Sequence, residues 1–289
     1  MQTQEVYLGQ DGIYTNSVGV KQLLDFYEDC KKFTDCVIHI KLDNLLWLDG
    51  NLCALLGALI FRLTQDNNLK FGIDAAEVTK KCSVLFHNDF LKIEQNVNLY
   101  KESSSIPFKG FYPKQKDEFT DYLDNELLSH KAMPKFSTEI KEKLIDDLIE
   151  IYGNIDKHAE TEFPFFVCGQ HFPKQEIIRF TICDLGVGFY KKIKHIKPDI
   201  IANSGDAILW AIDGNSTKPD APGGKGLKNL HEYLSENKGG IQIFSGDANW
   251  CSKEMAQNIA MKPQGISQLK KMFTGSSISL EFNKKVLLS

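Results

Sequence analysis

The segment that most constrains the fold is a buried-strand pattern that ends in an acid followed by two glycines. Residues 177–183 read IIRFTIC, a β-branched and aromatic run typical of a strand. Asp184 follows directly, and then come Gly186 and Gly188. A carboxylate at a strand end can accept hydrogen bonds, and glycines let the backbone approach a flat ligand because they lack a Cβ. An ordinary turn after a strand uses the same residues, so this segment alone leaves both interpretations open.

The flanking sequence predicts a sheet covered by helices on one face. Ser137 or Thr138 is a favourable N-cap, and apolar residues then recur three or four positions apart, as on a buried helix face. A further helix is expected directly after the glycines at 223–226. The expected strands are 163–168, 177–183, 240–245 and 277–282. This order of elements is typical of an α/β fold with its helices on one side.

The N-terminal part of the chain predicts a smaller α/β unit. The expected helices are 20–31 and 51–63, and the expected strands are 36–42 and 69–73. Residues 103–116 carry Ser, Pro and Gly and predict a connector, which leads into a helix over 119–133 that stops at Pro134. Residues 247–272 resemble an insertion between the last two strands, with no functional interpretation.

Three polar residues on the expected helix are spaced four apart: Glu150, Asn154 and His158. On a helix they form one row beside the apolar stripe, where they can face a ligand that lies across the helix. The Asn154 side-chain oxygen is a hard ligand suited to Mg²⁺, and Lys157 and His158 can meet phosphate charge. The alternative is an amphipathic helix whose polar edge is simply solvated.

A second glycine-rich segment points to an anion site. Gly223, Gly224 and Gly226 surround Lys225 immediately before the expected helix, and free backbone N–H groups at a helix start attract anions. Leu227 stands where the Walker motif needs a hydroxyl, and no dinucleotide-binding GxGxxG follows an early strand. The segment therefore fits neither of those two folds.

Together, these segments resemble the motifs of the GHKL, or Bergerat-fold, ATPases, which include histidine kinases, DNA gyrase and anti-sigma-factor kinases. The matching strings are EIYGNIDKHA (150–159, the N box), ICDLGVGF (182–189) and GGKGL (223–227, the two Gly boxes), GNSTKP (214–219, the ATP lid) and FTGSSISLEF (273–282, the final strand). The resemblance covers about residues 136–289.

The resemblance implies a Bergerat-type α/β sandwich, a mixed sheet with helices on one face, that binds Mg-ATP. Asp184 would pair with adenine, supported by the Ser277 hydroxyl, and Asn154 would coordinate Mg²⁺. Glu150 stands at the position of the general base in hydrolytic members. Lys157, His158 and Lys225 would contact phosphates. The remaining residues expected at the ATP site are Gly186, Gly188, Thr217, Lys218, Gly223, Gly224, Gly226 and Leu227. Residues of about 190–222 are expected to form a loop that closes over the phosphates.

The N-terminal unit resembles a STAS domain through NLLWLDGNLCALLGALI (44–60). Phosphorylated STAS proteins carry a Ser or Thr in the turn, whereas this chain has Asp49, Gly50 and Asn51 there. A generic α/β interaction domain is the alternative. The expected organisation is a STAS-like domain at 1–110, a helical connector at 111–135 and the ATP-binding domain at 136–289.

Three functions remain open from the sequence. The first is a regulatory ATPase or an anti-sigma-type protein kinase, and the second is a non-catalytic nucleotide-dependent switch for protein partners. The third, a sensor histidine kinase, would use His130, but Lys131 and Ala132 follow it where an acid is expected.

Bulk properties narrow the partners. The net charge of −4 and the pI near 6.0 argue against nucleic acid or anionic membrane as partners, which leaves ATP or ADP, a regulatory protein and a second copy of the chain. Seven cysteines without CxxC pairs and no apolar leader predict reduced thiols and a cytoplasmic location. Buried strand thiols are the expected role of Cys168 and Cys183, with metal binding together with His171 as the alternative.

Overall fold

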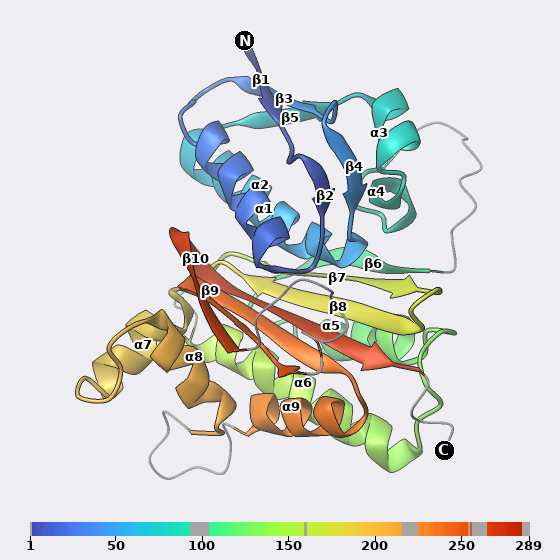
Figure 1. Cartoon of the computed structure of the whole chain (residues 1–289), viewed down its shortest axis with the longest axis vertical. Coiled ribbons are helices and arrows are strands. Elements are labelled where there is room, and N and C mark those ends of the chain that lie inside the picture. The colour runs from blue at the N-terminus through green and yellow to red at the C-terminus, as the bar shows by residue number, and fades with distance from the viewer. Residues whose placement is uncertain are drawn as a thin grey trace.

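The structure, a computed structural model, describes residues 2–92, 104–158, 161–215, 225–253, 255 and 265–284. Figure 1 shows three layers: a front domain (residues 2–92), a five-stranded sheet, and a layer of helices on the far side of that sheet. The chain is therefore a mixture of helices with parallel and antiparallel sheets, an α/β protein. None of the helices in the described ranges is long and apolar enough to cross a membrane.

The front domain contains the predicted helices and strands. Its elements are β1 Thr3–Tyr7, β2 Asp11–Ile13, α1 Ser17–Cys30, β3 Val37–Lys41, β4 Leu45–Leu48, the 3₁₀ turn η1 Gly50–Leu52, α2 Cys53–Asn67, β5 Lys70–Ile73, α3 Ala75–Lys81 and α4 Val84–His87. The main sheet is parallel in the order β1-β3-β5. The Asn16 side chain accepts a hydrogen bond from the Gly19 amide and begins α1, and Asn68 ends α2 in the left-handed conformation.

The second half of the chain supplies the larger sheet and its helices. Its elements are β6 Ser105–Phe111, α5 Lys116–Tyr122, the π-helix η2 Leu123–Leu128, α6 Thr138–His158, β7 Phe165–Phe172, β8 Ile177–Asp184, α7 Gly188–Ile196, α8 Ser204–Ile212, α9 Gly226–Glu236, β9 Gly240–Cys251 and β10 Gly265–Asn283. The strand order is β6-β7-β8-β10-β9. Each of these neighbouring pairs is antiparallel, so the prediction of a mixed sheet is wrong for this layer.

Strand β6 corrects a second prediction. Residues 105–111 lie within the stretch expected to be a connector, yet they pair with β7 at the edge of the sheet. Pro107 is tolerated there because an edge strand does not need every backbone N–H for pairing. The large sheet therefore begins before the long helix α6 rather than after it.

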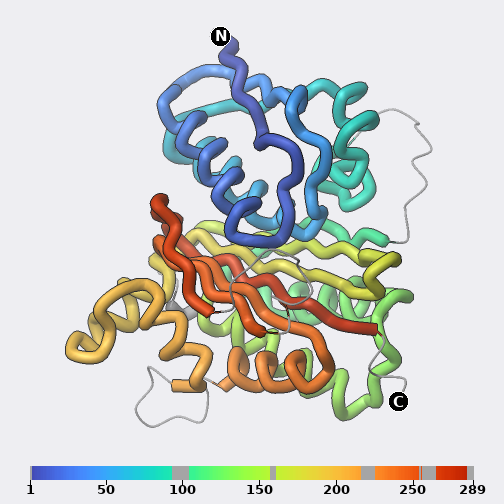
Figure 2. Tube along the Cα trace, viewed as in Figure 1, coloured from blue at the N-terminus to red at the C-terminus, as the bar shows by residue number. Residues whose placement is uncertain are grey.

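The two faces of the large sheet are covered by different partners, because side chains alternate along each strand. On β8, Ile178, Phe180 and Ile182 belong to the core formed with α6 and α9. Cys183 belongs instead to the core of the front domain. The tube in Figure 2 shows the front domain on one side of this sheet and the helices on the other.

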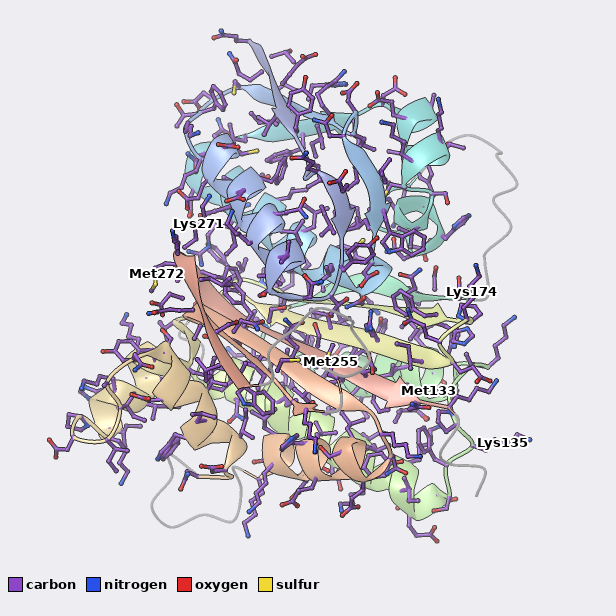
Figure 3. The ribbon with its side chains drawn as sticks, viewed as in Figure 1. Met133, Lys135, Lys174, Met255, Lys271 and Met272 are labelled. Carbon is purple, nitrogen blue, oxygen red and sulfur yellow. The ribbon has the colours of Figure 1, made fainter. Side chains whose placement is uncertain are left out.

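The stretch interpreted as an insertion, 247–272, largely continues the last two strands where it is described. Strand β9 runs on to Cys251 and β10 starts at Gly265, and these two residues pair with each other. The resulting arm reaches the front domain, where Lys271 forms an ion pair with Asp25 of α1. Figure 3 labels Lys271 and the neighbouring Met272 on this arm.

All seven cysteines are free and buried, as expected for reduced thiols. Burial raises the pKa of the Cys30 thiol to about 12. Cys168 and His171 lie three residues apart on β7 and hence on opposite faces of the strand. Within the described ranges, no group of three or more His, Cys, Asp or Glu is arranged to hold a metal ion.

Candidate nucleotide site

Asp184 is the last residue of β8 and is only 5% exposed. Its Oδ1 accepts a hydrogen bond from the Gly186 backbone N–H at 2.8 Å, and its Oδ2 accepts one from the Ser276 hydroxyl. Burial raises the pKa of this carboxyl, while the bonds from Ser276 and Gly186 act in the opposite direction. The site thus contains a buried carboxylate whose orientation is fixed from two sides.

The hydroxyl that supports Asp184 belongs to Ser276, so the prediction of Ser277 is off by one residue. Strand β10 pairs Ser276 with Asp184 and Ser277 with Cys183. Since side chains alternate, Ser277 faces the front domain, where it bonds the Cys183 thiol. A run of two serines does not indicate which of them points to which face; only the register of the strands does.

Gly188 has a backbone conformation and surroundings that require a glycine. Its φ is +72°, a conformation that side chains rarely adopt, and a Cβ there would lie 2.7 Å from Ser245 Oγ and 2.9 Å from the Gly275 carbonyl oxygen. Ser245 in turn accepts a hydrogen bond from the Phe189 N–H and donates one to Gly275. The turn after Asp184 is therefore held by hydrogen bonds that involve β9 and β10.

The second glycine segment packs against the polar row of α6. Gly226 is the first residue of α9, and a Cβ on it would lie 2.8 Å from the Asp147 carbonyl oxygen and 3.0 Å from Glu150 Oε2. Glycine thus permits the start of α9 to approach the carboxylate of Glu150. Two of the predicted motifs, far apart in sequence, are adjacent in the structure.

Asp147 is a residue at this junction that the sequence analysis missed. Its side chain is 5% exposed, its Oδ1 accepts a hydrogen bond from Asn229 of α9 at 2.8 Å, and burial raises its pKa. A carboxylate inside the apolar stripe of α6, next to the buried Leu144 and Leu148, was the available signal. Asp147 fastens α6 to α9 beside Glu150.

The other residues predicted for the site differ in their exposure to solvent. Asn154 is exposed, and a Cβ on the preceding Gly153 would meet no described atom within 4 Å. Lys225 is exposed at the start of α9, whereas Leu227 is buried in the core beneath the sheet. Outside the described residues lie Thr217, Lys218, Gly223 and Gly224, together with the side chains of Lys157 and His158.

The loop expected over 190–222 is wrong for most of the part that is described. Residues 188–196 form α7 and residues 204–212 form α8. Asn203 and Asp206 make a capping box at the start of α8, with each side chain bonded to the other's backbone N–H. Residues 216–224 lie outside the described part of the chain.

His130 is far from Asp184. Its ring contacts the ring of His171, with centroids 6.5 Å apart, close to the hairpin that joins β7 to β8. His171 pairs with Ile178 of β8, and Asp184 lies six residues further along that strand, which corresponds to about 20 Å. The candidate phosphoacceptor of a sensor histidine kinase is therefore at the opposite end of the sheet from the candidate adenine site.

The turn at Asp49, Gly50 and Asn51 is buried on the other face of the sheet. The Gly50 N–H donates to Gln170 of β7, and Asn51 donates to Thr181 of β8 at 2.8 Å. This turn, which corresponds to the phosphorylated turn in the resemblance to STAS domains, lies inside the interface between the two halves of the chain.

A buried charge network joins the same two halves. Arg179 of β8 bonds Asp49 at 3.2 Å and Glu281 of β10 at 2.9 Å, and each of these three side chains is at most 5% exposed. Asp49 also accepts bonds from Thr15 and Trp47, so its charge is well satisfied. The front domain is thus joined to the sheet by polar contacts that exclude water.

No protein-family model matches the chain, and the search of curated proteins finds no match either. The assignment of a function therefore depends on the geometry of the site and on the resemblance of its motifs.

Proposed function

We propose that this chain is an Mg-ATP-binding regulatory protein with a histidine-kinase-like ATPase domain, acting as an ATPase or as an anti-sigma-type protein kinase. The observation that carries the proposal is the convergence of separate segments on the helix side of the sheet. Asp184 ends a strand whose alternate side chains pack there, and Gly226 lies against Glu150 in the same layer. These are the three segments that resemble the GHKL motifs.

Asp184 has the chemistry needed to recognise adenine. The Asp184 carboxylate accepts hydrogen bonds from the Gly186 N–H and the Ser276 hydroxyl, and the backbone groups of Ser276 and Asp184 also lower its pKa. These partners are all neutral, so the carboxylate would still attract an exocyclic amino group as a further donor. Because a buried acceptor is costly to leave unpaired, a purine that lacks the amino group would bind less tightly.

Asn154 fits a role as magnesium ligand. Mg²⁺ in nucleotide sites usually takes one or two protein oxygens, and phosphate oxygens and water complete its shell. The exposed amide of Asn154 follows Gly153, where an added Cβ would meet no described atom within 4 Å, and this setting is compatible with that coordination. When bound, the metal would neutralise phosphate charge, and Lys225 at the start of α9 would add a positive charge.

Glu150 is the best candidate for a general base. Its carboxylate lies beside the first residue of α9, where free backbone N–H groups favour a phosphate. From that position Glu150 can orient an attacking water or hydroxyl and accept its proton.

Titration calorimetry with ATP and Mg²⁺ tests the binding step. The wild-type chain should bind, Asp184→Ala should lose the preference for ATP over GTP, and Asp199→Ala, an exposed carboxylate between α7 and α8, should behave as wild type. The expected loss is about 1–3 kcal/mol of binding free energy. Unchanged ATP affinity in Asp184→Ala would exclude this residue from adenine recognition.

A turnover assay tests the catalytic step. Glu150→Ala should keep ATP affinity within a few-fold and lower turnover by about 10²-fold, since a general base contributes to the reaction rather than to binding. Glu142→Ala, an exposed acid two turns earlier on α6, is the matched control. If the wild-type chain binds ATP but shows no turnover and no phosphotransfer, the nucleotide-dependent switch replaces the enzyme.

A further inference from the structure

One side chain of the front domain contacts the loop that follows Asp184. Arg62 of α2 donates from Nη2 to the backbone carbonyl oxygen of Leu185 at 2.7 Å. Leu185 is buried and belongs to the core of the front domain, although it lies next to Asp184 in sequence. The contact joins residues that are 123 positions apart.

This carbonyl and the N–H that holds Asp184 belong to the same peptide group. The Leu185 carbonyl oxygen accepts from Arg62, and the adjoining Gly186 N–H donates to Asp184 Oδ1 at 2.8 Å. A peptide group is planar, so fixing its carbonyl also fixes the direction of its N–H. A cation at the oxygen also polarises the N–H and strengthens the bond that it donates. Arg62 and Asp184 thus hold opposite ends of one peptide plane.

The guanidinium of Arg62 has little freedom to move away. It lies over the ring of Phe163, 5.6 Å from the ring centroid. Its Nε is buried and has no hydrogen-bond partner among the described residues. A buried donor without a partner lowers stability. The side chain therefore keeps the bond from Nη2 to Leu185 although its Nε is left without a described partner.

Helix α2 is linked to β8 and to the loop after it at two separate points. Asn51, just before the helix, bonds Thr181, and Arg62 bonds Leu185. From residue 51 to residue 62 a helix advances about 16 Å, and from 181 to 185 a strand advances about 13 Å. The two elements therefore run beside each other over matching lengths, and a displacement of α2 would act directly on the loop after Asp184.

We propose that Arg62 is a positioning residue for Asp184, and that through it the front domain sets the affinity of the nucleotide site. This inference rests on the proposed function. By reciprocity, bound nucleotide would also stabilise the docked position of α2. A partner that pulls α2 away from the sheet would weaken nucleotide binding without touching the nucleotide.

Calorimetry with Mg-ATP on the full chain provides the first test. Arg62→Gln should weaken binding about 10-fold, and Arg62→Lys, which keeps a cationic donor, should restore most of the affinity. Lys271→Gln is the matched control, because it removes an ion pair between the same two halves of the chain at a site away from Leu185. Equal ATP affinity in Arg62→Gln and Lys271→Gln would overturn the coupling.

Hydrogen exchange at the Gly186 amide, measured without nucleotide, provides the second test. Exchange should be faster in Arg62→Gln than in the wild-type chain and unchanged in Lys271→Gln. Wild-type exchange in Arg62→Gln would overturn the positioning role. If the wild-type chain binds no ATP, the proposed function fails, yet this measurement still decides whether Arg62 positions the loop.

Discussion

On the front-domain face of the large sheet, Arg179 lies between Asp49 and Glu281, whereas on the helix face the carboxylate of Asp184 is held by a hydroxyl and a backbone N–H. Both faces bury charged groups on the same strand, β8. On one face a cation pairs with the acids; on the other the described partners of the acid are neutral. This difference agrees with a structural role for the first network and with the ligand-binding role that we propose for Asp184.

The two networks also differ in which parts of the chain they join. Asp49 belongs to the front domain and Glu281 to β10, so the charged network crosses an interface between domains. Asp184 and Ser276 belong to neighbouring strands of one sheet, so their contact depends only on the strand register. Substitutions in the charged network should therefore lower the stability of the whole chain. Substitutions at Asp184 or Ser276 should instead weaken the proposed binding of nucleotide.

The largest expected effect is a loss of folding stability when the charged network is broken. Arg179→Leu leaves Asp49 and Glu281 buried without their cation and should lower the free energy of unfolding by about 3–5 kcal/mol. Lys271→Gln, which breaks a more exposed ion pair between the same two halves of the chain, should cost about 0–1 kcal/mol. Urea unfolding monitored by circular dichroism measures both. Similar losses in the two variants would remove the distinction between the buried and the exposed contact.

The next effect separates the two serines. Ser276→Ala removes the hydroxyl that donates to Asp184 and should weaken ATP binding by about 1 kcal/mol. Ser277→Ala changes a side chain on the opposite face and should leave the affinity unchanged. Calorimetric titration of both variants with Mg-ATP shows which of the two hydroxyls contributes to the affinity. A larger loss in Ser277→Ala would mean that strand alternation does not determine which hydroxyl serves the site.

The smallest effect is a change in the pH dependence of stability. Burial raises the pKa of Asp184 in the folded chain, so the folded state holds the proton more readily than the unfolded state. The resulting stabilisation is present at low pH and is lost as the pH rises from the ordinary carboxyl pKa through the raised one. Asp184→Asn, which has no charge to bury, should lack this loss.

Unfolding free energies measured across that pH window compare the two chains. The stability of the variant relative to the wild-type chain should increase as the pH rises, in the absence of nucleotide. A parallel pH dependence in both chains would show that the folded and unfolded states bind the Asp184 proton equally.

Local patterns in the sequence predicted the long elements well. The apolar stripe of α6 and the hairpin of β7 and β8 are both confirmed, because amphipathic spacing and strand alternation are local properties. Helices α7 and α8 were missed, although Asn203 and Asp206 carry the spacing of a capping box. Gly205 lies inside α8, where a single glycine does not end the helix.

Other features could not be predicted because they depend on pairing between distant segments. The antiparallel sheet requires the strand order, which the order along the chain does not give. The assignment of Ser276 instead of Ser277 requires the register against β8. The contact of Arg62 with Leu185 requires the docking of two domains, and no local pattern marks either residue.

The seven buried thiols have a practical consequence for spectroscopy. With their sulfur atoms inside the cores, the native cysteines should react slowly with maleimides while the chain stays folded. A new cysteine at an exposed position, such as Lys225→Cys at the start of α9, would then carry a fluorophore or spin label alone. Changes in the environment of this end of α9 could then be followed without removing a single native cysteine.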